Sequence, residues 1–371
     1  MDKMPAWADV VLIPLISLLL AALLSALVIL AIGENPVEAF QLMVEGALMR
    51  SSGWGYTLYY ATNFIFTGLA VAVAFHARMF NIGGEGQAML GGLGVALACL
   101  YVPWPHWTLA LLGSTVGAAL FGAAWALIPA YLQAKRGSHI VITTIMFNFI
   151  AAALLNYLLI GLLKPQGSME PASARFDPAF ALPTFQDMFA SEGNPLFRGA
   201  PANVSFFLAL AACLIVWLLI WRTRLGYEIR TMGHSPRAAS YAGIRQSRII
   251  IITMMFSGAL AGMMALNPIM GDQHRMQLDF VGGAGFVGIA VALIASGNYL
   301  SGAFWPLVLS GVLATGGWRA AYTVLGVVIL VTVIPGALFL RRRLPDEAAA
   351  QSDRISLARA KSSGFSPNAL T

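Results

Sequence analysis

Long runs without a charged residue constrain this chain more than any other feature of its sequence. No Asp, Glu, Lys or Arg occurs in the 49 residues between Glu85 and Lys135, or in the 39 residues between Asp279 and Arg319. A helix of about 20 apolar residues crosses the hydrocarbon core of a bilayer, so each run is long enough for two crossings. Only 10% of the 371 residues are charged, against about 25% in a soluble domain. The sequence therefore predicts an all-α, polytopic membrane protein.

Polar interruptions divide the chain into about ten predicted spans. They are 10–32, 56–75, 84–101, 108–134, 140–163, 203–221, 249–270, two within 279–319, and 320–340. Gly-rich segments near 80–90 and 279–297 could instead be re-entrant, which would give nine or eleven spans. Residues 1–343 are predicted to form one transmembrane domain. The polar tail 344–371 is predicted to be disordered, because it has too little apolar surface to bury.

The distribution of Lys and Arg predicts the orientation of the bundle. With ten spans, sixteen of the 22 Lys and Arg residues lie on one side of the membrane and six on the other. Cytoplasmic loops are enriched in these residues. Both termini and the basic loop 222–248 are therefore predicted to be cytoplasmic, and the loop 164–202 external. The net charge of +6 then needs no nucleic acid partner to explain it.

The basic loop contains a predicted short helix with recognisable ends. Ser235 can cap the first amides, Pro236 suits the first helical position, and Gly243 can adopt the left-handed conformation that ends a helix. The alanines would give the helix a small, flat face. A helix of about two turns is unstable alone in water, so we expect a partner protein to hold it; an ordinary solvated loop is the alternative. The predicted coupling residues are Ser235, Pro236, Arg237, Ala238, Ala239, Tyr241, Gly243 and Ile244.

A second group of polar residues interrupts the apolar spans. Polar side chains are costly in lipid and therefore face protein or water. Those of FNIGGEGQ (80–87) could gate a translocation path, or could pin a broken helix through hydrogen bonds. Asn148 and Asn156 are predicted to share one helix face, which could line a path or bond to other helices. Glu85 is expected near the cytoplasmic edge. The predicted path or gate residues are Asn81, Glu85, Gln87, Thr144, Asn148 and Phe286.

Glycine spacing predicts how the helices pack. Gly113 and Gly117, and likewise Gly258 and Gly262, form small-xxx-small pairs that allow helix backbones to approach closely in lipid. The Gly-rich segments 83–86 and 282–285 also resemble each other, which is compatible with an internal repeat, a common device in transporters.

The sequence lacks the motifs of several enzyme classes. It contains no G-x-x-x-x-G-K-[ST], H-E-x-x-H or C-x-x-C pattern, and its two cysteines lie within apolar runs. We therefore expect no catalytic residue, metal or cofactor, and any ATP hydrolysis on a separate subunit. Glu85 is the only acid associated with a predicted span, which argues against proton coupling. The alternative is a stand-alone channel or an ion-coupled secondary carrier for small polar solutes.

Three motifs carry a resemblance to a known family. FNIGGEGQ at 80–87, SPRAASYAGI at 235–244 and VGGAGFVGIAVALIASGN at 281–298 resemble signatures of bacterial ABC importer permeases of the ribose/simple-sugar and nucleoside class. In the last motif Ala295 replaces the usual glycine, and ITTIMFNFIA at 142–151 is similar to a further family stretch. The segment 33–48 is most similar to the nucleoside branch, which works with BMP-type lipoproteins. The resemblance covers about residues 33–340.

The resemblance implies a function and a set of partners. The chain would be a multi-pass permease subunit of a bacterial inner membrane that moves nucleosides or simple sugars by alternating access. Its partners would be ABC ATPase subunits in the cytoplasm, a second permease subunit that is identical or different, an extracytoplasmic substrate-binding protein and membrane lipid. Residues 235–244 would be the coupling helix that docks on the ATPase.

Overall fold

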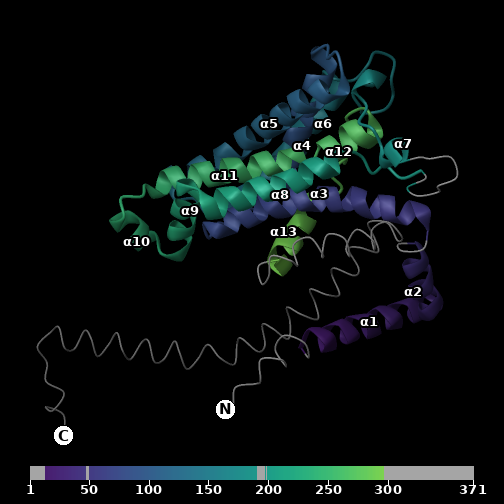
Figure 1. The fold of residues 1–371 in the computed structure, drawn as a ribbon, viewed down its shortest axis with the longest axis horizontal. Coiled ribbons are helices and arrows are strands. Elements are labelled where there is room, and N and C mark those ends of the chain that lie inside the picture. The colour runs from purple at the N-terminus through teal and green to yellow at the C-terminus, as the bar shows by residue number, and fades with distance from the viewer. Residues whose placement is uncertain (1–12, 47–49, 190–196, 198, 296–371) are drawn as a thin grey trace, which may run out of the picture. The chain divides into compact units, whose positions relative to one another are not determined.

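The computed structural model describes residues 13–46, 50–189, 197 and 199–295 (Figure 1). The described residues fall into two compact units, one up to residue 41 and one from residue 42, which we describe separately. The first unit contains α1 (Ile13–Ile32), which has no charged residue, and the start of α2 (Pro36–Val44), which follows after a bend of 116°. Gly33 at this bend has φ +95°, a conformation that glycine adopts without strain. The predicted spans beyond residue 295 and the predicted tail lie outside the described residues.

The second unit is a bundle of long helices with shorter helices at both ends and one, α13, beside α3 (Figure 1). The long helices are α3 (Ser51–His76), α4 (Gly84–Tyr101), α5 (Trp107–Arg136), α6 (Ile140–Gly161), α8 (Ser205–Arg222) and α11 (Gln246–Met263). The shorter ones are η3 (Pro178–Phe180), α7 (Phe185–Phe189), α9 (Arg224–His234), α10 (Pro236–Tyr241), α12 (Leu266–Pro268), η4 (Ile269–Gln273) and α13 (Ala284–Ala295). The described residues contain two isolated β-bridges and no strand. Five of their helices, or six if α1 and α2 form one broken span, are long and apolar enough to cross a membrane. The prediction of an all-α membrane protein is confirmed.

Small residues bring α4, α5 and α11 into close contact. A Cβ atom at Gly91 of α4 would overlap the backbone of Gly262 in α11, and one at Gly117 of α5 would lie 2.8 Å from the carbonyl oxygen of Gly94. Lipid provides no hydrophobic drive between helices, so such backbone contact is a main source of packing energy. The glycine-pair prediction holds for α11. Of the predicted pair in α5, only Gly117 meets another helix, because Gly113 faces the Trp104 ring instead.

Two helices of this unit, α4 and α13, begin inside the bundle rather than at its ends. After α3 the chain turns back into the interior, where Ala77, Met79 and Asn81 are buried, and α4 begins there at Gly84. The start of α4 contacts Asn148, the ninth of the 22 residues of α6. Glu85 is therefore 5% exposed in the bundle interior; its position near the cytoplasmic edge stays a prediction.

The two long polar loops lie at opposite ends of this bundle (Figure 1). At one end, which we call the α10 end, a buried apolar cluster joins α9 and α10 to the ends of the long helices; it includes Ala74, Met79, Ala130, Ile140, Ile220, Ile229, Met232, Ala239 and Ile249. At the α7 end the loop 164–202 packs on the segment that follows α12. Backbone bonds join Ser173 to Met276, Phe176 to His274 and Leu182 to Met270.

Candidate functional site

Asn81 is the centre of a polar cluster inside the bundle. Its Nδ2 donates to Gln87 Oε1 at 2.9 Å and to Ser257 Oγ at 2.8 Å, while its Oδ1 accepts from the Gly83 amide at 2.9 Å. Ser257 Oγ in turn donates to the carbonyl of Ala70 at 2.6 Å. These bonds tie α3, α4 and α11 together at the break before α4. Asn81 and Gln87 therefore satisfy each other within the chain, as the hydrogen-bond interpretation of the motif expects.

Residues of α6 complete this cluster. Asn148 Oδ1 accepts from the Gly86 amide, and Asn148 Nδ2 donates to the carbonyl of Ile82, both at 2.9 Å. Thr144 Oγ1 accepts from the Ile82 amide at 3.4 Å. A helix that begins inside a bundle exposes amides that have no intrahelical partner, and these side chains replace the water that would satisfy them at a surface.

Asn156 does not share the environment of Asn148. Asn148 is buried, whereas Asn156 lies on the exposed side of α6. Eight residues at 3.6 per turn leave the two side chains about 80° apart around the helix axis. The predicted common face was wrong, and only Asn148 reaches the interior.

Glu85 joins the two Gly-rich segments of the sequence. Its Oε1 accepts from the Gly283 amide and its Oε2 from the Gly285 amide, both at 2.9 Å. The carboxylate therefore lies at the N-terminus of α13, where the unpaired amides and the helix dipole favour a negative charge. The contact is tight, because a Cβ atom at Gly285 would overlap the backbone of Gly84 and Glu85. The sequence echo between these segments is thus matched by a direct contact between them.

The structure brings together five of the six predicted path residues. Asn81, Gln87, Thr144 and Asn148 share one hydrogen-bonded network, and Glu85 lies beside it. Phe286 is separate from this group and 42% exposed. We call the set Asn81, Glu85, Gln87, Thr144, Asn148 and Ser257 the inner knot.

A second buried polar cluster was missed by the sequence analysis. Asn267 Nδ2 donates to Asn63 Oδ1 and to the carbonyl of Tyr59, both at 2.8 Å. Asn267 Oδ1 accepts from Asn203 Nδ2 at 2.8 Å and from Ser205 Oγ at 3.1 Å. We call Asn63, Asn203, Ser205 and Asn267 the outer knot. The sequence does contain a signal for this cluster, because an isolated Asn within an apolar run is costly in lipid and therefore needs a polar partner.

The α10 helix forms as predicted from its end residues. Ser235 Oγ accepts from the Ala238 amide at 3.3 Å, Pro236 is the first helical residue, and Gly243 has φ +76°. Gln246 Nε2 then donates to the carbonyl of Pro236 at 2.8 Å, which fixes the exit of the chain.

The exposed face of α10 differs from the predicted one. Ala239 is completely buried in the apolar cluster of the α10 end, and Ile244 packs against that cluster. Ala239 therefore cannot press into a partner. The other five residues of α10 are exposed: Pro236, Arg237, Ala238, Ser240 and Tyr241, the last of which is 94% exposed.

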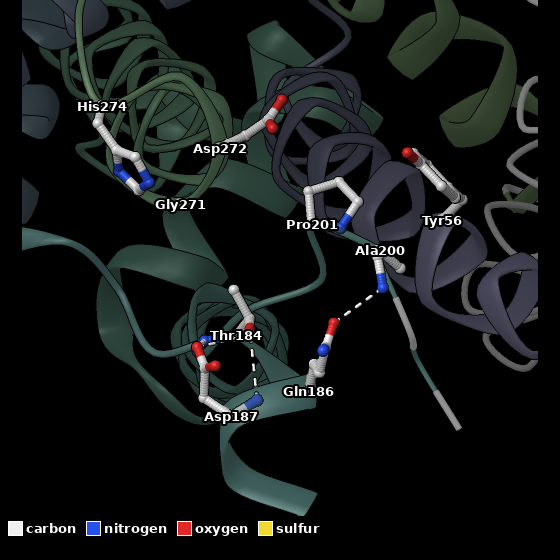
Figure 2. Close-up of a pocket in the computed structure, with 10 residues that line it drawn as sticks. Tyr56, Thr184, Gln186, Asp187, Ala200, Pro201, Gly271, Asp272 and His274 are labelled. Atoms are coloured by element: carbon white, nitrogen blue, oxygen red, sulfur yellow. Dashed lines mark hydrogen bonds between the residues drawn. The ribbon is translucent and has the colours of Figure 1, made fainter. Parts of the chain in front are cut away.

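An open pocket of 390 Å³ lies at the α7 end (Figure 2). Asp187 and Gln186 line it from α7, and Asp272 and His274 line it from the segment after α12. Asp272 Oδ2 accepts from the Tyr59 hydroxyl at 3.3 Å. The lining is rich in hydrogen-bond acceptors and is open to solvent. Over the part of the chain that the structure describes, no three His, Cys, Asp or Glu residues are grouped as metal ligands, and Cys99 and Cys213 are free thiols.

The bundle combines apolar spanning helices, helices that begin in its interior and a short exposed helix at one end. Together these features are typical of a membrane transport permease. Residues 54–340 match the family described as branched-chain amino acid transport system / permease component, and the chain belongs to this family.

Similar proteins support this class. The chain is 30% identical over 340 residues to a glucose ABC transporter permease of Haloferax volcanii, a match that covers 89% of each chain. It is 33% identical to a nucleoside ABC transporter permease of Lactococcus lactis, with 82% of this chain and 83% of that one covered. It is 31% identical to a guanosine ABC transporter permease of Bacillus subtilis, with 82% and 85% covered. The resemblance to ABC permeases is therefore confirmed.

Proposed function

We propose that this chain is the membrane-spanning subunit of an ABC importer for nucleosides or simple sugars, with nucleosides favoured. The observation that carries the proposal is the two-sided environment of α10. Its buried side is anchored by Ala239 in the bundle, and its other side presents Arg237 and Tyr241 to solvent. A helix of six residues is not stable alone, so its shape depends on the bundle that it contacts. It is therefore suited to transmit force from a partner.

The apolar cluster provides a route for that force. Ile229, Met232 and Ala239 from α9 and α10 pack with Ile220 of α8 and Ile249 of α11. Packed cores move between discrete arrangements rather than deforming continuously. A displacement of α10 by a separate ATPase subunit would therefore move the ends of the long helices together, and the chain would switch between outward and inward states. Ser235, Pro236, Gly243 and Ile244 would hold the shape of this coupling segment.

The α10 end is proposed to be cytoplasmic and the α7 end external. The arginine-rich loop lies at the α10 end, and cytoplasmic loops are enriched in such residues. With this orientation we keep the proposal of ten spans in residues 1–343, both termini and the tail 344–371 inside, and a bacterial inner membrane. The acceptor-lined pocket then faces the extracytoplasmic substrate-binding protein. A second permease subunit would complete the membrane part.

The inner knot is proposed to position a gate rather than to bind solute. Asn81, Gln87, Thr144 and Asn148 bond to groups of the chain itself, which leaves them little capacity for a passing sugar or base. Glu85 holds α13 through backbone amides, so its release would free that helix. Phe286 on α13 is exposed and is the predicted path residue best placed to meet solute.

The exposed face of α10 tests the coupling proposal. The complete transporter, with its ATPase and binding protein, is reconstituted in proteoliposomes and its uptake of radiolabelled guanosine and glucose is measured. We expect Arg237→Glu with Tyr241→Ala to lower ATP-driven uptake about tenfold while thermal unfolding stays unchanged, because exposed substitutions alter stability by about 0.5 kcal/mol or less. Tyr227→Ala, at an exposed tyrosine of α9, is the matched control and should transport normally.

Two outcomes would contradict the proposal. Normal uptake by the double variant would show that α10 does not receive the force. Uptake by the chain alone, without an ATPase and driven by an ion gradient, would instead support a secondary carrier.

A further inference from the structure

Two arginines lie over tryptophan rings where α8 ends. The guanidinium carbon of Arg222 is 5.5 Å from the ring centroid of Trp217, and that of Arg230 is 4.5 Å from the ring centroid of Trp221. The two rings are one helical turn apart on α8, and His76 of α3 meets Trp221 edge-on at 6.2 Å. We call Trp217, Trp221, Arg222 and Arg230 the arginine–tryptophan surface.

Among the residues that the structure describes, neither guanidinium of this surface has a carboxylate partner. The described residues contain one ion pair, Arg275 with Glu170, which lies at the α7 end. Glu228 is the only acid between Arg222 and Arg248 and forms no ion pair with either arginine. The Nε of Arg230 is buried and has no hydrogen-bond acceptor. The rings therefore hold two positive charges in place without a counter-ion from the described part of the chain.

The position of the surface indicates where a counter-ion would come from. α8 is long and apolar enough to span a bilayer, and Leu210, Leu214 and Leu218 on it are exposed. Trp217 and Trp221 are 44% and 37% exposed. Tryptophan rings at the end of a span lie at the headgroup level of a membrane. The guanidiniums above them therefore lie where lipid phosphates are found.

We propose that the arginine–tryptophan surface binds the phosphate headgroup of an anionic phospholipid. The guanidinium fork matches the geometry of two phosphate oxygens, and stacking on a ring fixes its plane before the lipid arrives. The tryptophan rings would pack against the glycerol and upper acyl region. This charge arrangement is the one expected for an anionic leaflet, which attracts basic residues beside a span.

The site would link lipid composition to the coupling end of the protein. Arg230 belongs to α9, and α9 is fixed to the bundle at Gly233, where an added Cβ would overlap the carbonyl of His76. α9 leads directly into α10 through Ser235. A bound lipid would therefore stabilise the corner from which α10 projects.

The test measures lipid binding by the purified full-length chain in a neutral detergent. Thermal unfolding is followed while dioleoyl-phosphatidylglycerol, dioleoyl-phosphatidylcholine or inorganic phosphate is added. We expect a rise in the midpoint with phosphatidylglycerol only. Arg222→Gln with Arg230→Gln should weaken the apparent affinity for phosphatidylglycerol about 30-fold, since each basic residue near an anionic surface contributes about fivefold.

Two variants control for loss of charge and for damage to the α8–α9 corner. Arg237→Gln with Arg245→Gln removes the same charge from exposed residues of the same loop and should leave the affinity unchanged. Arg222→Lys with Arg230→Lys keeps the charge without the planar fork and should give an intermediate affinity. For each variant, the unfolding midpoint with lipid is compared with the midpoint of the same variant before lipid is added.

Each contrary outcome overturns the proposal in a distinct way. An equal rise with phosphatidylcholine would show that only apolar contact matters. An equal rise with inorganic phosphate would indicate a site for free anions, such as a phosphorylated solute. An equal loss in the Arg237/Arg245 control would show diffuse electrostatics without a site.

Discussion

The inner and outer knots both satisfy polar side chains inside an apolar bundle, but they do so with different partners. Both bury polar side chains within an apolar bundle, and both join helices that are far apart in the sequence. In the outer knot the partners of Asn267 are neutral side chains and one carbonyl. In the inner knot the carboxylate of Glu85 holds the start of another helix through backbone amides. We therefore propose that the outer knot is a fixed joint, whereas the inner knot has one contact made by a carboxylate, whose release would free a helix.

The largest effect is expected from breaking the outer knot with Asn267→Leu. The substitution removes four hydrogen bonds and leaves Asn63, Asn203 and Ser205 buried without this partner. An unsatisfied buried group costs about 1–3 kcal/mol, so we expect about 3 kcal/mol of lost stability. Uptake should fall in proportion to folded protein. SDS-induced unfolding in mixed micelles measures the stability change.

Asn156→Leu is the matched control, because Asn156 is exposed on α6. It should unfold and transport like the native chain. If Asn267→Leu also has native stability, the outer knot is not a joint that holds the fold.

Glu85→Gln should separate transport from stability. The amide retains one acceptor for Gly283 or Gly285 but turns its NH₂ group toward the other amide, so one bond is lost. We expect a stability loss of about 1–2 kcal/mol, smaller than for Asn267→Leu. Uptake per folded molecule should nevertheless fall about tenfold, because the contact at the start of α13 is altered; reconstituted uptake measures this.

Gln87→Glu tests the same region by adding a carboxylate instead of removing one. It places a new charge two positions after Glu85, in the same buried motif. We expect it to lower the yield of folded protein, because a buried charge without a partner is costly. If Glu85→Gln loses stability and uptake in equal proportion, the inner knot is a fixed joint like the outer one.

The smallest effect is expected from Ser257→Ala within the inner knot. It removes the acceptor of Asn81 Nδ2 and the donor to Ala70. Asn81 keeps its bonds to Gln87, so we expect about 1 kcal/mol of lost stability and near-native uptake. Thermal unfolding and uptake are measured together.

The buried serine of α5 provides the control for this substitution. Ser114→Ala removes only the contact between Ser114 and Cys99 and should be milder still. A loss of uptake in Ser257→Ala as large as that in Glu85→Gln would assign the gate to the whole inner knot rather than to the carboxylate.

Local chemistry made several features predictable from the sequence. The absence of charge over long runs indicates membrane helices, because an unpaired charge in lipid is costly. Ser235, Pro236 and Gly243 mark the ends of α10, because capping and backbone preferences act within a few residues. The family signatures are likewise continuous segments, so they can be recognised without knowing how the chain returns on itself.

Tertiary structure decided the features that depend on distant parts of the chain. Glu85 meets Gly283 and Gly285 across about 200 residues of sequence, and no local pattern predicts this contact. Ala239 faces inward because α9 positions α10 against an apolar cluster, although its sequence neighbours are exposed. The sequence by itself therefore determined where the long apolar helices and α10 lie and which residues must avoid lipid, but not that α9 is helical. Only packing determined which of those residues meet, because each polar group is satisfied by the partner that the fold places beside it.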